Sequence, residues 1–213
     1  MSVDTFKKTL AKRYFDRWAL TYDKSILQHM IFRASHEMFI KEIATTKKAK
    51  FKALDVGCGT GELAKKIIHR FKKANVHGVD ISETMIKKAG AKKMKKPVKF
   101  RVGDVEKLPY KDNSFDVITC SHSFHHYPNK EKAMTEMHRV LKPNGHLMII
   151  DGSRDVLLGR IIFDIVTMVE KHVYHLFHGE FRDIFRRNGF KVTMQKRFNL
   201  VPQLLTVGTA SKA

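Results

Sequence analysis

Apolar positions change their spacing along the chain, and these changes predict alternating strands and helices. Short apolar runs at 51–56, 75–79, 98–102, 115–120 and 146–150 are typical of buried strands. Between them, apolar residues recur at helical spacing in 62–73, and further helical segments begin near Ser82 and Asn129. Because parallel strands need long crossovers, which pack as helices, the alternation predicts a parallel sheet covered on both faces.

The flanking segments extend this core in two ways. Segments 4–20 and 24–43 have helical spacing and predict an N-terminal helical extension. After Asp151, a long amphipathic segment at 155–178, a helix ending at Asn188 and strands at 191–196 and 204–207 are expected.

No repeat or linker divides the chain, so its 213 residues predict one domain. The expected fold is α/β, doubly wound and Rossmann-like, with a mostly parallel seven-stranded sheet and helices on both faces. Within 1–213 we expect a helical cap at 1–48, a cofactor-binding core at 49–151, and lid helices with terminal strands at 152–213.

Composition narrows the class of protein. The chain is 43% hydrophobic and 29% charged, which is typical of a folded globular protein. Two cysteines, Cys58 and Cys120, are too few for a disulfide framework, so a reducing, cytoplasmic location is the expectation. The first eleven residues contain no apolar core of a signal peptide, and no stretch approaches the roughly 18 apolar residues of a membrane span.

The net charge of +20, from 41 Lys and Arg against 21 Asp and Glu, favours attraction to polyanions. The basic residues are scattered, which favours solvated helix faces over one binding groove. A nucleic-acid partner is therefore kept as a rival interpretation but not preferred. Peripheral contact with an anionic membrane is a further interpretation.

The strongest chemical signal is a glycine loop, Leu54-Asp55-Val56-Gly57-Cys58-Gly59-Thr60-Gly61, where the first strand turns into a helix. Glycines there let a ligand approach the backbone closely, and Asp80 at the end of the next strand suits ribose hydroxyls. Glu62 begins the helix and would repel a pyrophosphate. These residues predict an adenosine-containing ligand without a phosphate.

These motifs resemble the class I S-adenosylmethionine-dependent methyltransferases, and the resemblance covers most of 51–151. It rests on the loop, on Val79-Asp80-Ile81-Ser82 and Met85, and on Gly103-Asp104-Val105-Glu106. It continues through Ser114-Phe115-Asp116-Val117-Ile118 and Glu136-Met137-His138-Arg139-Val140-Leu141-Lys142-Pro143-Asn144-Gly145. Within the superfamily the chain looks most like the small-molecule branch that includes the ubiquinone and menaquinone methyltransferases.

The resemblance implies S-adenosylmethionine as the cofactor and assigns its contacts. Gly57 and Gly59 would pass beneath the methionine portion, with Asp55 near its ammonium group. Asp80 would hold the ribose, Ile81 and Met85 would contact the adenine, Asp104 would bind the adenine amino group, and Val105 would supply a backbone contact. Tyr22 resembles an aromatic residue that closes over the cofactor. Cys58, Gly61 and Ser121 complete the predicted cofactor contacts.

The segment after the fourth strand, Ser121 to Pro128, would meet the methyl acceptor. His125, His126 and Tyr127 are candidate catalytic or substrate-positioning residues, because a neutral imidazole can accept a proton from a phenol, enol or amine. The alternative is that this string has a structural role. Asp116 lies at the opposite end of its strand and is interpreted as structural.

No metal site is expected. His172, His175 and His178 would spread over about 120° of a helix and would not converge on one ion. The apolar residues around them suit either plain core or a lid over an apolar substrate.

The sequence therefore predicts methyl transfer to a small, apolar or aromatic acceptor at carbon, oxygen or nitrogen. Two alternatives stay open: an RNA-directed methyltransferase that uses the basic surface, and a non-catalytic S-adenosylmethionine-binding protein. The oligomeric state is not predicted.

Overall fold

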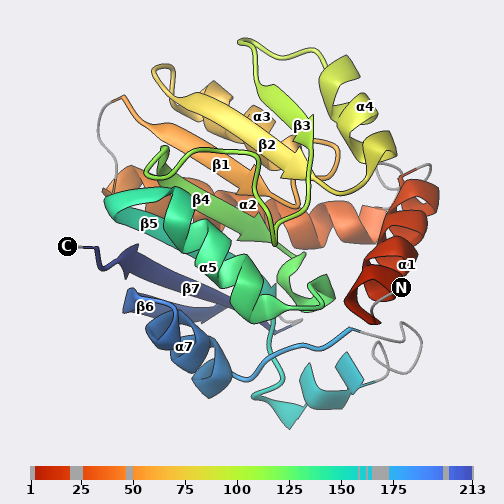
Figure 1. The fold of residues 1–213 in the computed structure, drawn as a ribbon, viewed down its shortest axis with the longest axis vertical. Helices are drawn as coiled ribbons and strands as arrows, with labels where there is room; N and C mark the ends of the chain where they lie inside the picture. Colours follow the sequence, from red (N-terminus) through yellow and green to blue (C-terminus); the bar gives the residue numbers. More distant parts are fainter. Residues whose placement is uncertain are drawn as a thin grey trace.

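Seven strands form one central sheet in the order β3-β2-β1-β4-β5-β7-β6. They are β1 (Lys52–Val56), β2 (Asn75–Asp80), β3 (Lys99–Val102), β4 (Phe115–Ser121), β5 (Leu141–Gly152), β6 (Phe190–Phe198) and β7 (Gln203–Ala210). The computed structural model describes residues 3–19, 26–46, 50–157, 159–161, 163–164, 173–198 and 202–212. Figure 1 shows the sheet running through the middle of the molecule, between helices.

The sheet is mixed. β3, β2, β1, β4 and β5 pair in parallel, whereas β7 runs antiparallel to both β5 and β6. The Rossmann-like order and the seven strands agree with the sequence-based prediction, whereas the expected mostly parallel sheet is corrected to a mixed one by the antiparallel β7. Because β6 and β7 pair as neighbours, they need no helical crossover between them.

The helices with described bounds are α1 (Val3–Trp18), α2 (Ile26–Thr46), α3 (Glu62–Arg70), α4 (Glu83–Ala91), α5 (Lys130–Val140) and α7 (His178–Arg187). Two clusters of buried hydrophobic side chains fill the space between the sheet and the helices, one on each face. One packs β1, β4 and β5 against α5 and α7, and the other packs the opposite sheet face against α2 and α3.

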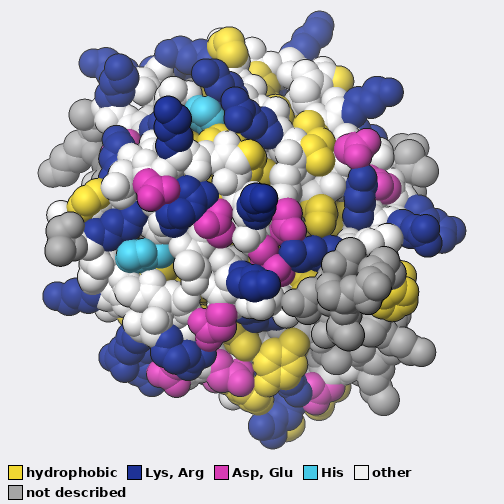
Figure 2. Space-filling view, viewed as in Figure 1, with side chains coloured by type: hydrophobic (Ala, Val, Ile, Leu, Met, Phe, Trp, Pro, Cys, Tyr) yellow, Lys and Arg dark blue, Asp and Glu magenta, His cyan; other side chains and the backbone are white. Residues whose placement is uncertain are grey.

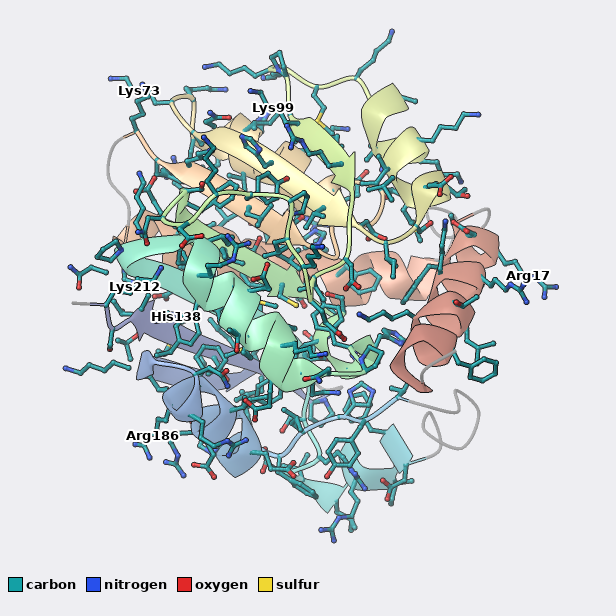
Figure 3. The ribbon with its side chains drawn as sticks, in the orientation of Figure 1. Arg17, Lys73, Lys99, His138, Arg186 and Lys212 are labelled. Atoms are coloured by element: carbon teal, nitrogen blue, oxygen red, sulfur yellow. The ribbon has the colours of Figure 1, made fainter. Side chains whose placement is uncertain are left out.

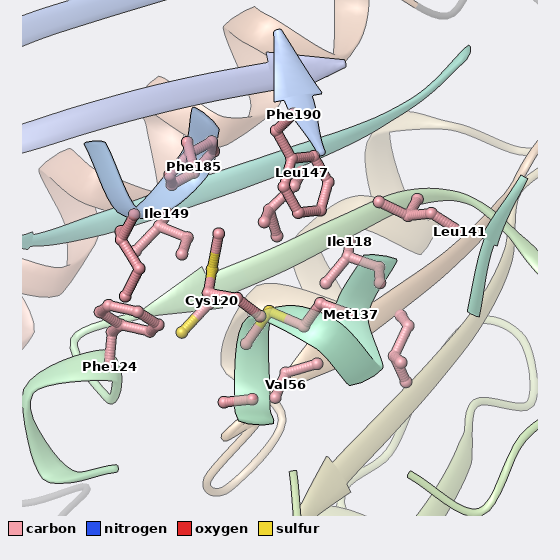
Figure 4. Packing of buried hydrophobic residues seen from close by; sticks show 14 of the residues in the cluster. Val56, Ile118, Cys120, Phe124, Met137, Leu141, Leu147, Ile149, Phe185 and Phe190 are labelled. Atoms are coloured by element: carbon pink, nitrogen blue, oxygen red, sulfur yellow. The ribbon is translucent and has the colours of Figure 1, made fainter. Parts of the chain in front are cut away.

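The central strands are apolar throughout because both of their faces are buried. In β4, Ile118 and Cys120 belong to the cluster on the α5 and α7 side, whereas Val117 belongs to the α2 and α3 side. Figure 4 shows the first of these clusters, with Met137 of α5 and Phe185 of α7 facing the strands. This packing fixes the carboxyl ends of β1 and β4 beside each other.

The segment after β5 departs from the prediction of one long helix over 155–178. Residues 173–177 form neither helix nor strand, and α7 begins only at His178. Val173, His175 and Leu176 are nevertheless buried, so this stretch packs as part of the core. Residues 158, 162 and 165–172 lie outside the described structure.

No helix within the described ranges is both long and apolar enough to cross a membrane.

Candidate active site

A cavity opens at the carboxyl ends of β1, β2 and β4, where the strand order reverses around β1. In open α/β sheets this switch point is where ligands bind. The cavity is walled by the loops after these strands and by side chains of α1 and α2. Its lining residues are Lys8, Phe15, Phe32, Val56, Gly57, Gly59, Val79, Asp80, Ile81, Met85, Gly103, Asp104, Val105, Glu106, Ser121, His122, Ser123, His126, Tyr127 and Pro128.

The glycine loop after β1 is held tightly against the end of β2. The backbone N–H groups of Gly57 and Cys58 both donate to the Val79 carbonyl, at 2.9 and 3.1 Å. Gly57 has a φ of 66°, and a Cβ there would lie 2.4 Å from the Ser123 Oγ. Only glycine combines this left-handed backbone with so close an approach. The loop therefore presents bare backbone to the cavity.

Asp80 fixes the far side of this loop. Its Oδ2 accepts a hydrogen bond from the Gly59 N–H at 2.8 Å, and its Oδ1 accepts one from the Ser82 N–H at 2.9 Å. Burial raises the pKa of the carboxyl. Each carboxylate oxygen has two acceptor positions, so Asp80 retains room for hydroxyl donors from the cavity.

Asp55 lies beneath the loop and does not line the cavity directly. It is 2% exposed, and the Thr119 hydroxyl donates to its Oδ1 at 2.9 Å. Burial, together with the charge of Asp80, raises the pKa of Asp55 to about 7, against the smaller lowering effect of Thr119. A cation bound above Asp55 would favour its charged form.

Helix α1 closes one side of the cavity through Lys8. The Lys8 Nζ contacts the Asp104 Oδ2 and the Glu106 Oε2, each at 2.6 Å. Burial would lower the pKa of Lys8, but hydrogen bonds to the two carboxylates outweigh it and raise the pKa. Asp16 of the same helix bonds the Ser82 hydroxyl. Contacts with the loops that follow β2 and β3 thus anchor α1 at the cavity mouth.

Aromatic rings and imidazoles form the opposite wall. The His126 ring meets Phe15 of α1 edge to face at 4.8 Å between centroids, and His122 meets Phe32 of α2 at 4.9 Å. Burial is the main cause that lowers the pKa of His122 to about 4 and the pKa of His126 well below its usual value. This wall is therefore uncharged at neutral pH.

A hydrogen-bond chain orients His122, which has a left-handed φ of 51°. The Ser35 hydroxyl donates to the Gln203 Oε1 at 2.8 Å, and the same oxygen lies 2.7 Å from the His122 Nε2. Because the single hydroxyl proton is used on Gln203, the neutral His122 donates its Nε2–H to Ser35. Its Nδ1 is then the acceptor.

Ser123 and Tyr127 meet under the glycine loop. Their hydroxyl oxygens are 2.8 Å apart, and both lie near the Cys120 thiol. Burial raises the pKa of Tyr127 well above 10, so its hydroxyl stays protonated at neutral pH. Beside them, the Ser121 Oγ is buried, lines the cavity and has no hydrogen-bond partner among the residues that the structure describes.

His125 turns away from the cavity toward a buried carboxylate. Its Nδ1 lies 2.6 Å from the Asp151 Oδ1, and its backbone N–H donates to the Asp151 Oδ2 at 2.9 Å. The His175 ring stacks on His125 with centroids 4.2 Å apart. Burial would raise the pKa of Asp151, but the two imidazoles outweigh it and hold that pKa well below 3.8.

The ligand atoms of His125, Asp151 and His175 all lie within 4.8 Å of one another, which matches the spacing of a metal site. The contacts indicate a hydrogen-bonded cluster instead. Asp151 already accepts from two backbone N–H groups, those of His125 and Gly152. The stacked imidazole planes are also tilted by only 29°, so they do not converge on one point. His172, from the metal interpretation that the sequence disfavours, lies outside the described residues.

Most predicted site residues come together at the cavity. The lining includes Gly57, Gly59, Asp80, Ile81, Met85, Asp104, Val105, Ser121, His126 and Tyr127. Asp55, Cys58, Gly61 and His125 lie behind it, and Tyr22 falls outside the described residues. The Cys58 side chain points into the protein, where burial raises the pKa of its thiol well above 9.

Sequence reasoning missed several cavity residues: Lys8, Phe15, Phe32, His122 and Ser123. The first three come from α1 and α2, whose place over the sheet is a tertiary contact without a local motif. His122 and Ser123 lie in the same segment, Ser121 to Pro128, in which His125 and His126 were the predicted candidates. Asp116 is at the far end of β4, where its carboxylate binds the Lys52 N–H and the Lys142 ammonium, in keeping with a structural role.

Comparisons with known proteins agree with this geometry. Residues 54–149 match the family model described as a methyltransferase domain. A demethylmenaquinone methyltransferase of Staphylococcus epidermidis is 31% identical over 161 residues, which cover 74% of this chain and 66% of that protein. A ubiquinone/menaquinone biosynthesis C-methyltransferase of Brucella abortus is 29% identical, over 69% of this chain and 57% of that protein. The matched part of the chain thus spans between 57% and 66% of the length of these two relatives.

The same fold occurs in solved structures. The magnesium protoporphyrin IX methyltransferase from Synechocystis superposes with a TM-score of 0.78 at 17% identity, covering 96% of this chain and all of that one. At this identity the similarity concerns the fold.

Proposed function

This chain belongs to the class I S-adenosylmethionine-dependent methyltransferases, and we propose that it transfers a methyl group to a small, apolar or aromatic acceptor. The supporting observation is the shape of one cavity with two unlike walls. Bare glycine backbone and carboxylates form one wall, and uncharged aromatic and imidazole rings form the other.

The described residues fit the donor. The loop offers a cradle at Gly57 that a Cβ would fill, and Asp80 keeps acceptor positions for the ribose hydroxyls. Ser121 presents a buried hydroxyl whose bonding groups are unused by the described residues. When bound, the donor supplies a methyl group activated by the positive charge on its sulfur. The Asp55 carboxylate would then neutralise the ammonium group of the donor's methionine portion.

The ring wall supports the proposal of an apolar or aromatic acceptor. Phe15 and Phe32 exclude water, while His126 lines the cavity as a neutral imidazole that can accept a proton at nitrogen. We assign to Tyr127 a positioning role, because its buried phenol stays protonated and bonds Ser123. His125 faces Asp151 and would act by fixing the loop that carries His126.

A labelled-methyl assay tests this function. The purified protein is incubated with S-adenosylmethionine carrying a radioactive methyl group and with a small-molecule extract of cells, and labelled products are identified. We expect label in a small apolar or aromatic compound. Label in added RNA would favour the RNA-directed alternative. Saturable S-adenosylmethionine binding without any labelled product would favour the non-catalytic alternative.

His126→Phe, compared with His138→Phe as a matched control, separates chemistry from binding. His126→Phe keeps the ring contact with Phe15 but removes the acceptor nitrogen. Lower turnover with unchanged cofactor affinity is the expected result if His126 accepts the proton. Equal turnover in both variants would show that His126 does not accept a proton and that the site acts by aligning donor and acceptor.

A further inference from the structure

Cations gather on one face of the sheet over β1, β2 and β3, mostly toward the amino ends of these strands. Lys52 begins β1, and Lys99 and Arg101 lie on β3. The register pairs His77 of β2 directly with Lys99, and pairs Lys52 with Asn75, two residues before His77. Since side chains alternate across a strand, Lys52, His77, Lys99 and Arg101 share one face of the sheet.

The charges in this group are poorly neutralised. Burial, followed by repulsion from Lys99 and Lys142 and more weakly from Arg101, lowers the pKa of Lys52. The carboxylate that opposes this effect is Asp116, and Asp116 already binds the Lys142 ammonium at 2.9 Å. Lys52 is thus repelled by three other cations and attracted by one carboxylate that already binds another ammonium. Figure 2 shows Lys and Arg side chains crowding the upper part of the molecule, and Figure 3 places Lys99 there.

Aromatic rings hold two of these cations in place. The Lys52 ammonium lies 4.7 Å from the centre of the Phe115 ring, and the Arg101 guanidinium lies 5.6 Å from that of Tyr110. Cation–π contacts of this kind position a charge without neutralising it. Phe115 is fully buried, so its ring is not free to stack on a nucleic-acid base.

Beneath these cations lies a histidine with unused bonding groups. His77 is 5% exposed, and neither ring nitrogen has a hydrogen-bond partner within the described ranges. Its ring packs edge to face on Tyr110 and Phe115. The Tyr110 hydroxyl is likewise buried without a partner there. A neutral imidazole carries one N–H, which needs an acceptor, and buried polar groups are rarely left unsatisfied.

We propose that Lys52, Lys99 and Arg101 form a binding site for a phosphate dianion on this face of the sheet, with the buried His77 ring beside it as a neighbour that responds to the added charge. A phosphate group brings the negative charge that the cations lack and several acceptor oxygens for the ammonium and guanidinium donors. The ligand is a small phosphate-bearing molecule, because the rings beneath the cations are packed into the core and offer no surface for bases.

A charge-reversal series tests the site with inorganic phosphate as the probe, titrated calorimetrically into the full chain at low ionic strength. Lys99→Glu and Arg101→Glu change exposed side chains, so folding is not at risk. Each is expected to weaken phosphate binding at least about tenfold. Lys65→Glu, an exposed position on α3, makes the same change in net charge and is expected to alter binding less than about twofold.

The ring of His77 provides a second readout. Burial, followed by the charges of Lys52, Lys99 and Arg101, lowers the pKa of His77 to about 4. A phosphate held above it would raise that pKa and shift its ring nitrogen resonances. Equal weakening in all three variants, or unchanged His77 resonances at saturating phosphate, would overturn the site. RNA that binds this face tightly and is not displaced by phosphate would overturn the choice of ligand.

Discussion

Carboxylates lie at the carboxyl ends of β1 and β2 and in the loop after β3. Cations lie on the same strands, mostly toward their amino ends. Asp55, Asp80 and Asp104 lie around the cavity, and Lys52 and Lys99 lie at the other end, with Arg101 further along β3. The cavity also turns bare glycine backbone toward its ligand, while the cationic end is built from long flexible side chains.

This difference in charge between the two ends of the sheet allows one fold to favour a cationic ligand at one place and an anionic ligand at another. A donor with a positively charged sulfur and an ammonium group is attracted to the carboxylate end and repelled from the other. The net charge of +20 would otherwise oppose a cationic ligand everywhere. The carboxylates around the cavity therefore have to act locally, where burial strengthens electrostatic interactions.

The largest effect is expected from filling the cradle. Gly57→Ala adds a Cβ 2.4 Å from the Ser123 Oγ at a φ of 66°. Both the clash and the left-handed backbone disfavour the loop, so S-adenosylmethionine affinity should fall more than about a hundredfold. Gly90→Ala in α4, where a Cβ would meet nothing within 4 Å, is the control. Calorimetric binding measures both, and equal affinities would contradict the role of the loop.

A second test removes charge at one end or the other of the sheet. Asp80→Asn leaves one acceptor oxygen where two now bind the Gly59 and Ser82 N–H groups. We expect cofactor affinity to fall about thirtyfold, since a charge-assisted acceptor for the ribose is lost. Asp116→Asn makes the same chemical change at the amino end and should leave the affinity unaltered. If both variants bind the cofactor as the unaltered chain does, Asp80 is not a ligand residue.

The pH dependence sharpens the comparison further. The pKa of Asp55 is raised to about 7, so below pH 7 this carboxyl takes up a proton and loses its attraction for an ammonium group. Cofactor affinity should therefore decline by up to about tenfold for each pH unit below 7. Asp55→Asn should flatten this profile between pH 5 and pH 8, roughly the range around that pKa. A wild-type profile that is flat from the start would rule out the coupling.

The same pKa has a consequence for folding with the opposite sign. A carboxyl whose folded pKa is raised binds more protons in the folded state than in the unfolded state. Its favourable contribution to the free energy of unfolding is present below about pH 4 and is lost as the pH rises through about 7. Cofactor binding and this part of stability should thus respond to pH in opposite directions, which denaturant titrations at several pH values can show.

The smallest expected effect concerns helix α1. Lys8→Met removes the contacts with Asp104 and Glu106 that anchor α1 at the cavity mouth. Bound cofactor should then dissociate about threefold faster, in the range expected for a partly buried ion pair. Lys12→Met, also on α1, removes an exposed contact with Glu83 of α4 and serves as the control. Stopped-flow dissociation rates distinguish the two, and identical rates would show that Lys8 does not hold the cavity closed.

The sequence was most informative where chemistry is encoded locally. The glycine loop, Asp80 and Asp104 follow directly from the ends of predictable strands, and the structure places all of them at the cavity. The central strands β1 and β4 could be predicted because residues on both of their faces are buried, which makes them largely apolar. The direction of β7 could not, because the apolar pattern of a strand reads the same whether it pairs parallel or antiparallel with its neighbours.

Long-range contacts account for the remaining differences. His125 and His126 are adjacent in sequence, yet one binds Asp151 of β5 and the other lines the cavity beside Phe15 of α1. Residues 173–177 have helix-compatible spacing, but they form no helix and contribute His175 to the stack on His125. Tertiary packing decided the backbone there, and no local pattern reports it.

The most direct test follows backbone amide resonances while S-adenosylmethionine is added to the labelled protein. The account predicts saturable shifts that are largest at 56–61, 80–85 and 103–106, with little change at Lys52, His77 and Lys99. Shifts centred on the amino ends of the strands, or no saturable shifts at all, would contradict it.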